Sequence, residues 1–225
     1  MSQPTAILIF SRTILAESRV KQLHQHKGTN LQLHQALYNN TIATAKATTL
    51  PYYIINEKEQ IGSTFGEKIT NAISHIFAKG YNNVITIGTD CVSITTNQIL
   101  QAATELQYNN NCIGADNHGG AYIIALQKEN FDASIFKNLK WCTNNIYSDL
   151  KNYCLHTNNN LTQLTVRHDV NNATVLKQLL HKCKASIITL LTTIYSSLFL
   201  INLFNSPIYT ANLQWANNRR GPPYL

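Results

Sequence analysis

Short apolar runs alternate with amphipathic helical segments along most of this 225-residue chain. The runs at residues 5–10 and 84–87 are nearly continuous, which is typical of strands that are buried on both faces of a sheet. Residues 65–78 carry apolar side chains at helical spacing and precede Gly80, so they predict an amphipathic helix. Because strands that alternate with helices build a parallel or mixed sheet with both faces covered, the sequence predicts an α/β domain.

The other segments follow the same alternation. Residues 31–37 alternate apolar and polar positions until Gln35 breaks the pattern, and Gly28 and Asn30 are expected to end the helix before them. Helices are expected at 11–26, 95–106, 144–153 and 172–183, and strands at 31–37, 51–55, 112–115, 122–126 and 161–166.

The C-terminal segment differs from the rest, because residues 185–218 contain no formally charged side chain. Residues 187–204 are rich in Leu, Ile, Phe and Tyr and are long enough to span a bilayer. Their Thr and Ser side chains gather on one side, which favours a helix packed on the domain or on a second subunit of a homodimer. A membrane helix or surface anchor is the alternative. We therefore expect one α/β domain at 1–184 and a separate apolar helix and tail at 185–225.

The charge balance of 18 Lys and Arg against 11 Asp and Glu, a net +7, favours anionic partners such as nucleotides or phosphorylated sugars. The basic residues are scattered rather than clustered, which argues against nucleic acid. The five cysteines have no C-x-x-C spacing, which argues against a zinc knuckle or a disulfide framework. The first ten residues lack the pattern of a signal peptide, so a reducing cytoplasm is the expected location.

Asp90 is the sharpest candidate for a functional residue. It follows the strand at 84–87 through Gly88 and Thr89, and ligands of open α/β sheets bind beyond the carboxyl ends of the strands. A carboxylate there can bind a ribose hydroxyl or a divalent cation, and Mg²⁺ needs only one or two protein carboxylates when phosphates supply further oxygens. Asp116 or Asp169 could provide the second carboxylate. The alternative role for Asp90, capping the next helix, suits Thr95 or Thr96 better.

Basic residues and glycines mark two further loops. Arg12, Arg19 and Lys21 follow the first strand, where they could hold phosphates or could form a solvated helix face. Gly119-Gly120 permits close approach of a ligand or forms a plain turn. The chain has no P-loop, no G-x-G-x-x-G and no G-x-S-x-G motif. The sequence therefore does not support a P-loop phosphate site, a dinucleotide site or the serine nucleophile of an α/β-hydrolase.

Six short stretches of the chain form a recognisable series when they are taken in order: I-L-I-F-S-R (7–12), Q-I-G-S-T-F-G-E-K (60–68), V-I-T-I-G-T-D-C (84–91), G-A-D-N-H-G-G-A-Y-I-I-A-L (114–126), K-W-C-T (140–143) and D-V-N-N (169–172). Together they resemble the bacterial GT-A-like glycosyltransferase family that is also known as a domain of unknown function and is sometimes named for arsenosugar biosynthesis. The resemblance covers residues 6–179. It implies the nucleotide-diphospho-sugar transferase fold, a nucleotide-diphospho-sugar donor and a divalent metal, Mg²⁺ or Mn²⁺.

This chain departs from the family pattern at several positions. Val92 and Ser93 replace a Pro-Asp pair, and His118 replaces the Asp of a D-G-G triplet. The usual Gly and Lys-Thr-Arg run of the first loop is also absent, and D-V-D-T becomes D-V-N-N, although Asn171 can still offer an oxygen to a metal.

The resemblance implies roles for the residues that remain. Asp90 and Asn171 would hold the metal, and Arg12, Arg19 or Lys21 would contact the phosphates. The sugar and an unknown acceptor would lie over Gly119 and Gly120, with His118 as the base. Three functions stay open: a glycosyltransferase, a nucleotidyltransferase on the same fold, and a catalytically impaired member that binds a nucleotide or a protein partner.

Overall fold

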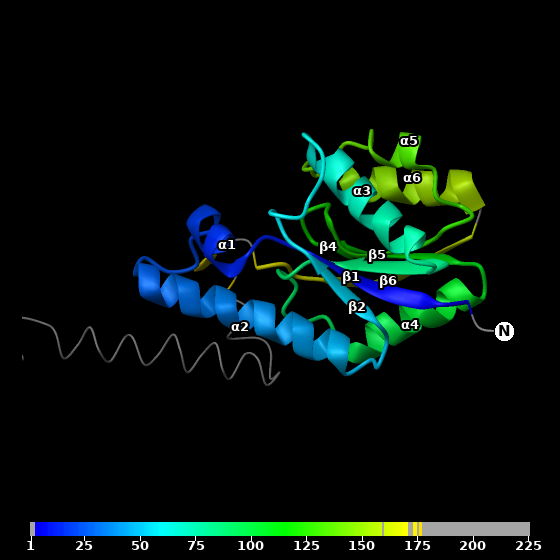
Figure 1. The fold of residues 1–225 in the computed structure, drawn as a ribbon. Helices are drawn as coiled ribbons and strands as arrows, with labels where there is room; N and C mark the ends of the chain where they lie inside the picture. Colours follow the sequence, from blue (N-terminus) through cyan, green and yellow to red (C-terminus); the bar gives the residue numbers. More distant parts are fainter. Residues whose placement is uncertain (1–2, 159, 171–172, 175, 177–225) are drawn as a thin grey trace, which may run out of the picture.

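The computed structural model describes residues 3–158, 160–170, 173–174 and 176 (Figure 1). They form one six-stranded sheet in the order β2-β1-β3-β5-β4-β6. β1 pairs in parallel with β2 and β3, β4 pairs in parallel with β6, and β5 is antiparallel to β3 and β4. The predicted mixed, mainly parallel sheet is therefore confirmed. The strands are β1 (Thr5–Phe10), β2 (Tyr52–Ile55), β3 (Asn83–Ile87), β4 (Asn111–Asp116), β5 (Ala121–Gln127) and β6 (Leu161–Arg167).

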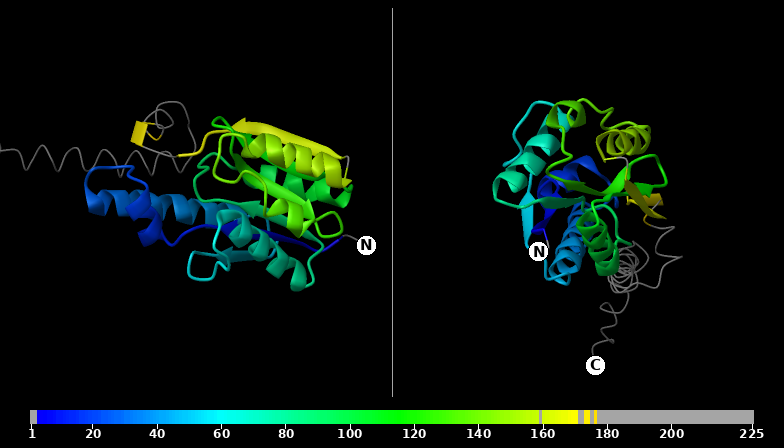
Figure 2. Two further views of the ribbon diagram at one scale, coloured as in Figure 1. Left: turned by 90° about the horizontal axis from the view of Figure 1, so that it is seen from above. Right: turned by 90° about the vertical axis from the view of Figure 1, so that its right-hand side faces the viewer.

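Helices cover both faces of the sheet (Figures 1 and 2). One face is covered by α3 (Phe65–Ala78), α5 (Ala133–Phe136) and α6 (Ile146–Asn158), and the other by α2 (Lys27–Lys46) and α4 (Thr96–Gln107). The short helix α1 (Ile14–Val20) follows β1 and packs on α2.

Two apolar clusters, one on each face, hold these layers together. Within β3 every residue is buried, and successive side chains alternate between the clusters: Val84 belongs to the α3 side and Ile85 to the α4 side. This two-sided burial explains why the sequence of the strand is almost continuously apolar. Full burial of one such side chain stabilises the fold by roughly 1.5–3 kcal/mol before entropy costs.

Local capping defines α3 and α4. The hydroxyl of Thr64 accepts from the backbone N–H of Glu67, whose carboxylate accepts in return, and Thr95 and Gln98 form the same reciprocal pair at the start of α4. The predicted bounds 65–78 match α3, and Thr95 is the cap expected for α4. Thr95 therefore performs the capping role that was the alternative for Asp90.

The prediction for residues 11–37 is wrong in two respects. The helix does not run from 11 to 26, and residues 31–37 are not a strand but part of the 20-residue helix α2. Leu33 and Leu37 are both buried, one helical turn apart, as on the inner face of a helix.

Asn30 does not end a helix either. Its side-chain oxygen accepts from the backbone N–H groups of Leu23 and His24 at 2.7 and 3.2 Å, and its amide donates to the carbonyl oxygens of Ser18 and Lys21. It thus closes the connection between α1 and α2. The short helix α5, capped by Asp132, was not predicted.

Several predictions lie wholly or largely outside the described residues. They are the helix at 172–183, the apolar helix at 187–204, the domain boundary at 184–185 and the metal ligand Asn171. In the part of the chain that the structure describes, no helix is long and apolar enough to cross a membrane.

Candidate functional site

A cavity of about 500 Å³ opens at the carboxyl ends of β1, β2 and β3, where the strand-end rule places ligands. Loops after all three strands contribute to it, and the start of α3 forms a further wall. Its lining includes Ser11 and Arg12 after β1, Glu57 and Gln60 after β2, Gly88 to Cys91 after β3, Phe65 and Lys68 on α3, and Trp141, Cys142 and Asp169.

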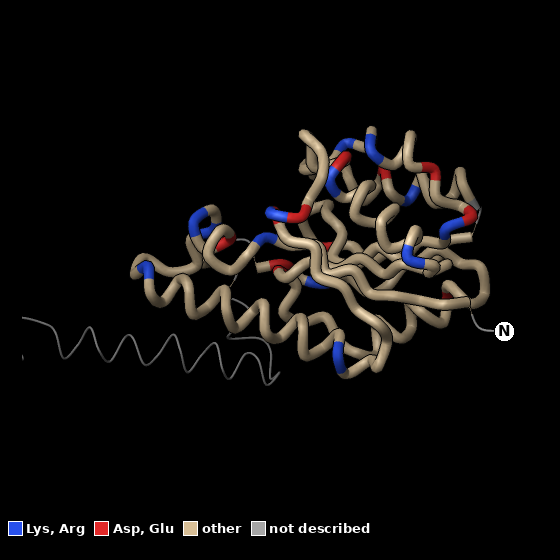
Figure 3. Tube along the Cα trace, viewed as in Figure 1, with Lys and Arg blue, Asp and Glu red and all other residues tan. Residues whose placement is uncertain are grey.

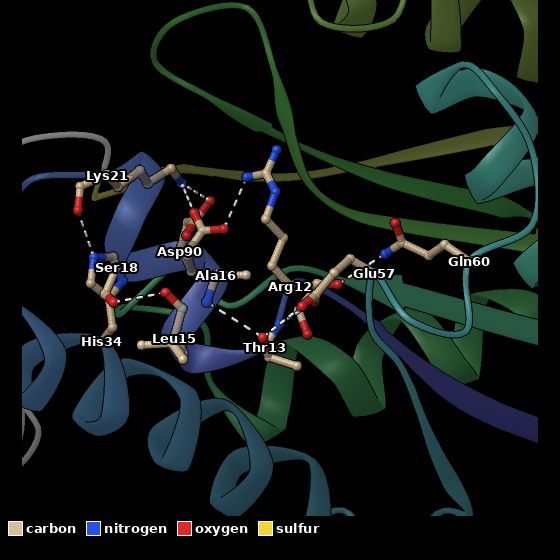
Figure 4. A network of polar contacts seen from close by, with 12 residues as sticks. Arg12, Thr13, Leu15, Ala16, Ser18, Lys21, His34, Glu57, Gln60 and Asp90 are labelled. Carbon is tan, nitrogen blue, oxygen red and sulfur yellow. Dashed lines mark hydrogen bonds and ion pairs between the residues drawn. The ribbon is translucent and has the colours of Figure 1, made fainter.

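One end of the cavity carries a chain of alternating charges (Figure 4). The Nη1 atom of Arg12 lies 3.0 Å from Oε2 of Glu17, and Nζ of Lys21 lies 3.2 Å from Oε1 of Glu17. The Lys21 ammonium also pairs with the Asp90 carboxylate. We call Arg12, Glu17, Lys21 and Asp90 the charged end. Two of its members come from α1 and its C-terminal cap, which brings them to the strand that precedes Asp90.

The charges stabilise one another against burial. Burial alone would raise the pKa of Glu17, but Lys21 and Arg12 outweigh this effect and lower it. Burial opposes the charge of Lys21 in the same way, and Asp90 and Glu17 raise its pKa above the ordinary value. Burial raises the pKa of Asp90, against the attraction of Lys21. A further cation close to Asp90 would therefore stabilise the ionised carboxylate.

Asp169 lies next to Asp90, because the backbone N–H of Val170 donates to the Asp90 carbonyl oxygen at 2.9 Å. The Oδ1 atom of Asp169 is buried and has no hydrogen-bond partner. Burial, together with the charges of Asp90 and Asp116, raises the pKa of Asp169 to about 7. Of the two residues that the sequence offered as a second carboxylate, Asp116 and Asp169, the structure thus places Asp169 beside Asp90.

The carboxylates of Asp90 and Asp169 fit a divalent cation, with one qualification from the geometry. A cation would supply the partner that Asp169 Oδ1 lacks and would remove the repulsion between the two groups. Among the described residues there is no cluster of three or more His, Cys, Asp or Glu side chains that could hold a metal alone. Phosphate oxygens of a bound nucleotide would have to complete the coordination shell. Lys21 occupies one side of Asp90 and would have to share it.

The residues around Gly119 form the turn between β4 and β5. Oδ1 of Asp116 accepts from the backbone N–H groups of His118 and Gly120, both at 2.7 Å. Gly119 has φ +84°, and an added Cβ would collide with the carbonyl oxygen of Asn144, so the turn itself requires this glycine.

The turn lies next to the cavity rather than in its wall. Ala121 and Tyr122, which follow the two glycines, line the cavity, whereas the described lining residues do not include Gly119, Gly120 or His118. The side chain of His118 is exposed. Arg19 is also exposed, in the last turn of α1, and does not belong to the described lining.

Lys and Arg are otherwise spread over many elements of the described chain (Figure 3). Several site residues were not singled out by the sequence. Glu17 could have been found, because it stands four residues before Lys21 on a predicted helix. Thr86, Phe65 and Trp141 lie within the stretches that carry the resemblance, but nothing marked them individually, because a Thr in a strand and a large aromatic side chain are ordinary core residues.

The fold is a mixed α/β sheet covered by helices on both faces, and its candidate site lies at the carboxyl ends of parallel strands. Residues 23–143, more than half of the chain, match the model of the family described as "Uncharacterized protein conserved in bacteria (DUF2064)". The chain belongs to this family, and the resemblance found in the sequence is confirmed. No protein of curated function matches the chain.

One solved structure shares the fold, and two others are similar with TM-scores below 0.5. A protein from Desulfovibrio desulfuricans G20, whose name assigns it provisionally to the nucleotide-diphospho-sugar transferases, is 18% identical and has a TM-score of 0.68; the match covers 94% of this chain and 95% of that one. The rv0371c homolog from Mycobacterium sp. strain JC1 has a TM-score of 0.48 at 11% identity, with 84% and 100% covered. The CMP:2-keto-3-deoxy-manno-octonic acid synthetase, complexed with CTP, has a TM-score of 0.42 at 8% identity, with 78% and 96% covered.

Proposed function

We propose that this protein is a glycosyltransferase that takes its sugar from a nucleotide-diphospho-sugar and uses a divalent metal, Mg²⁺ or Mn²⁺. The observation that carries the proposal is the convergence of Arg12, Lys21, Asp90 and Asp169 in one cavity at the carboxyl ends of β1 and β3. Cationic side chains and a carboxylate pair together are what a metal-bound diphosphate requires. The family and the fold support the same conclusion.

Asp90 and Asp169 are the residues that would hold the metal. Asn171, two residues after Asp169, would be a further ligand through its side-chain oxygen. A metal held there would neutralise the negative charge that develops on the diphosphate leaving group. Lys21 and Arg12 act on the same oxygens. Lys21 exchanges its contact with Asp90 for a phosphate oxygen, and Glu17 continues to hold both cations at the cavity.

The acceptor side of the reaction depends on the turn between β4 and β5. We propose that the acceptor approaches over Gly119 and Gly120, and that His118 takes its proton, since an imidazole can accept a proton near neutral pH. His118 is exposed, so this role requires an acceptor that reaches out over the turn.

A second function, nucleotide binding without catalysis, is favoured by one observation. The Lys21 ammonium already pairs with Asp90, the carboxylate that a metal would need. If this pair persists when a nucleotide binds, the phosphates are held by Arg12 and Lys21 alone and no metal takes part.

Calorimetric titration distinguishes the two functions. The full-length protein is titrated with UDP, GDP, CDP and ADP, each with Mn²⁺ and with EDTA, and then incubated with the sugar nucleotide of the base that binds. A glycosyltransferase binds one nucleoside diphosphate in a Mn²⁺-dependent manner and, with water taking the place of the acceptor, slowly hydrolyses the sugar nucleotide to that diphosphate and the free sugar. Equal binding in EDTA without release supports the non-catalytic function, and no binding of any nucleotide contradicts both.

A further inference from the structure

The second end of the cavity is aromatic. Phe10, Phe65 and Trp141 all line it, and their rings contact one another: the centroids of Phe10 and Phe65 are 5.6 Å apart, and those of Phe65 and Trp141 are 5.5 Å apart. Phe65 is the first residue of α3 and is 42% exposed, although it is a large apolar side chain. We call Phe65 and Trp141 the aromatic wall.

Trp141 is held in place from behind. Its Nε1–H donates to the carbonyl oxygen of Phe136 at 2.9 Å, and the two rings pack edge to face with centroids 5.0 Å apart. The backbone of Gly66 lies so close that an added Cβ would stand 2.6 Å from Cδ1 of the Trp141 ring. The indole N–H is therefore already used, and the side chain offers the cavity an apolar ring surface in a fixed orientation.

Two buried hydroxyl groups line the same cavity. Ser11 and Thr86 are 9% and 5% exposed, and neither Ser11 Oγ nor Thr86 Oγ1 has a hydrogen-bond partner. Thr86 belongs to β3 and pairs with Ile124 of β5, which is part of the apolar cluster on the α3 side of the sheet. Buried polar atoms in folded proteins nearly always have a partner, so these two oxygens indicate that a polar ligand group enters here.

The structure assigns this end of the cavity to the binding of a saccharide ring. The proposal is that the ring stacks on Phe65 and Trp141 while its hydroxyl groups bond to Ser11 and Thr86. It rests on the proposed function, because the ring is that of the sugar whose diphosphate lies at Arg12 and Lys21.

The geometry favours a sugar over a nucleobase. The Phe65 and Trp141 planes are tilted by 45° and touch each other, so they form one wall and not a parallel slot between two rings. A sugar has an apolar C–H face that suits one aromatic wall, and its hydroxyl edge suits partners that both donate and accept. The diphosphate and the sugar of one donor would then share a single cavity.

Tryptophan fluorescence tests the contact with the ring. The chain has two tryptophans, Trp141 and Trp215, so Trp215→Phe leaves Trp141 as the only reporter. UDP-glucose is compared with UDP, and GDP-mannose with GDP, each at saturation as established by calorimetry. We expect the sugar nucleotide to change the Trp141 emission and the diphosphate alone to leave it unchanged. An equal change with the diphosphate alone would assign the wall to the nucleobase and overturn the proposal.

A matched pair of substitutions tests the hydroxyl group. Thr86→Val removes a hydroxyl without changing the shape of the side chain, and Thr70→Val makes the same change at another buried, unpartnered Thr hydroxyl on α3 that is not among the described lining residues. We expect Thr86→Val to weaken binding of the sugar nucleotide by about tenfold, as for the loss of one hydrogen bond, and to leave binding of the diphosphate unchanged. Thr70→Val should change neither affinity.

The two measurements separate this proposal from the proposed function. Unchanged affinity of Thr86→Val for both ligands would show that the Thr86 hydroxyl meets only water, and would overturn the saccharide contact while the nucleotide site stands. Loss of both affinities to the same extent would assign Thr86 to the nucleotide. If the parent protein binds no nucleoside diphosphate at all, the proposed function fails and the saccharide subsite fails with it.

Discussion

The two ends of the cavity differ in how well their polar groups are satisfied. At the charged end, Arg12, Glu17, Lys21 and Asp90 are paired with one another. In the rest of the cavity lining, which includes the aromatic end, the hydroxyl groups of Ser11 and Thr86 have no partner. A ligand at the charged end must compete with existing ion pairs, so its binding free energy is the difference between the contacts that it forms and those that it replaces. A ligand at the aromatic end adds hydrogen bonds without breaking any, which suits selection between sugars.

The largest expected effect comes from a substitution at the charged end. Asp90→Asn should weaken Mn²⁺-dependent nucleotide binding by on the order of 100-fold, because even residues that only support a metal ligand change affinity by about 10- to 100-fold. The fold should persist, since Asn retains an oxygen for Lys21 and the Asp90 side chain is 31% exposed. Calorimetry with Mn²⁺ measures the affinity. Asp132→Asn is the control, because Asp132 caps α5 and Asn caps a helix equally well. If Asp90→Asn and the parent protein have the same affinity, Asp90 is not a ligand of the metal.

The next effect concerns the aromatic end. Gly66→Ala places a methyl group against the Lys137 carbonyl and the Trp141 ring, and should lower the free energy of unfolding by about 1–3 kcal/mol. Gly88→Ala is the control, because an added Cβ at Gly88 meets no atom within 4 Å, and its change should stay within about 0.5 kcal/mol. Urea unfolding measures both. A stabilised Gly66→Ala variant, as helix propensity alone would give, would show that Trp141 is not held by α3.

The pH dependence of stability tests the electrostatic interaction between Asp90 and Asp169. The pKa of Asp169 is about 7 in the folded chain against an ordinary value of 3.8, so the folded state binds this proton more tightly than the unfolded state. Its contribution to stability is present at low pH and is lost as pH rises through 7. In EDTA, the free energy of unfolding should fall between pH 6 and pH 8 by on the order of 1 kcal/mol more in the parent than in Asp169→Asn. Identical pH profiles would mean that Asp169 titrates normally.

The smallest expected effect lies in the turn beside the cavity. His118→Ala should change the affinity for the nucleoside diphosphate by less than about twofold and stability by less than about 0.5 kcal/mol, because the ring is exposed, its hydrogen bond with Asn117 is long, at 3.4 Å, and the turn is held by the backbone N–H of His118. If His118 is the base, release of the diphosphate from the sugar nucleotide should fall by about 100-fold or more in the same variant. Unchanged release would exclude that role.

Helices with an apolar buried face were predicted correctly, and a helix with polar residues on its buried face was not. α3 was predicted with its observed bounds because its inner positions are apolar at helical spacing and Gly80 follows its end. α2 was missed because Asn30, His34 and Thr41 lie on its buried side, so no apolar stripe marks the helix. The side chain of His34 instead forms a hydrogen bond with the backbone carbonyl oxygen of Lys21 at 3.0 Å, a contact that no periodicity predicts.

The sequence by itself determined the alternation of strands and helices and, through the strand-end rule, the positions of Arg12 and Asp90 at the candidate site. Local pattern suffices for this, because hydrophobic period and capping act between residues a few positions apart. Only the tertiary structure decided which groups meet there. Lys21 and Asp90 are 69 residues apart, and Asp169 reaches Asp90 through a single backbone hydrogen bond. The order of the strands sets these contacts, and it depends on packing of both sheet faces at once.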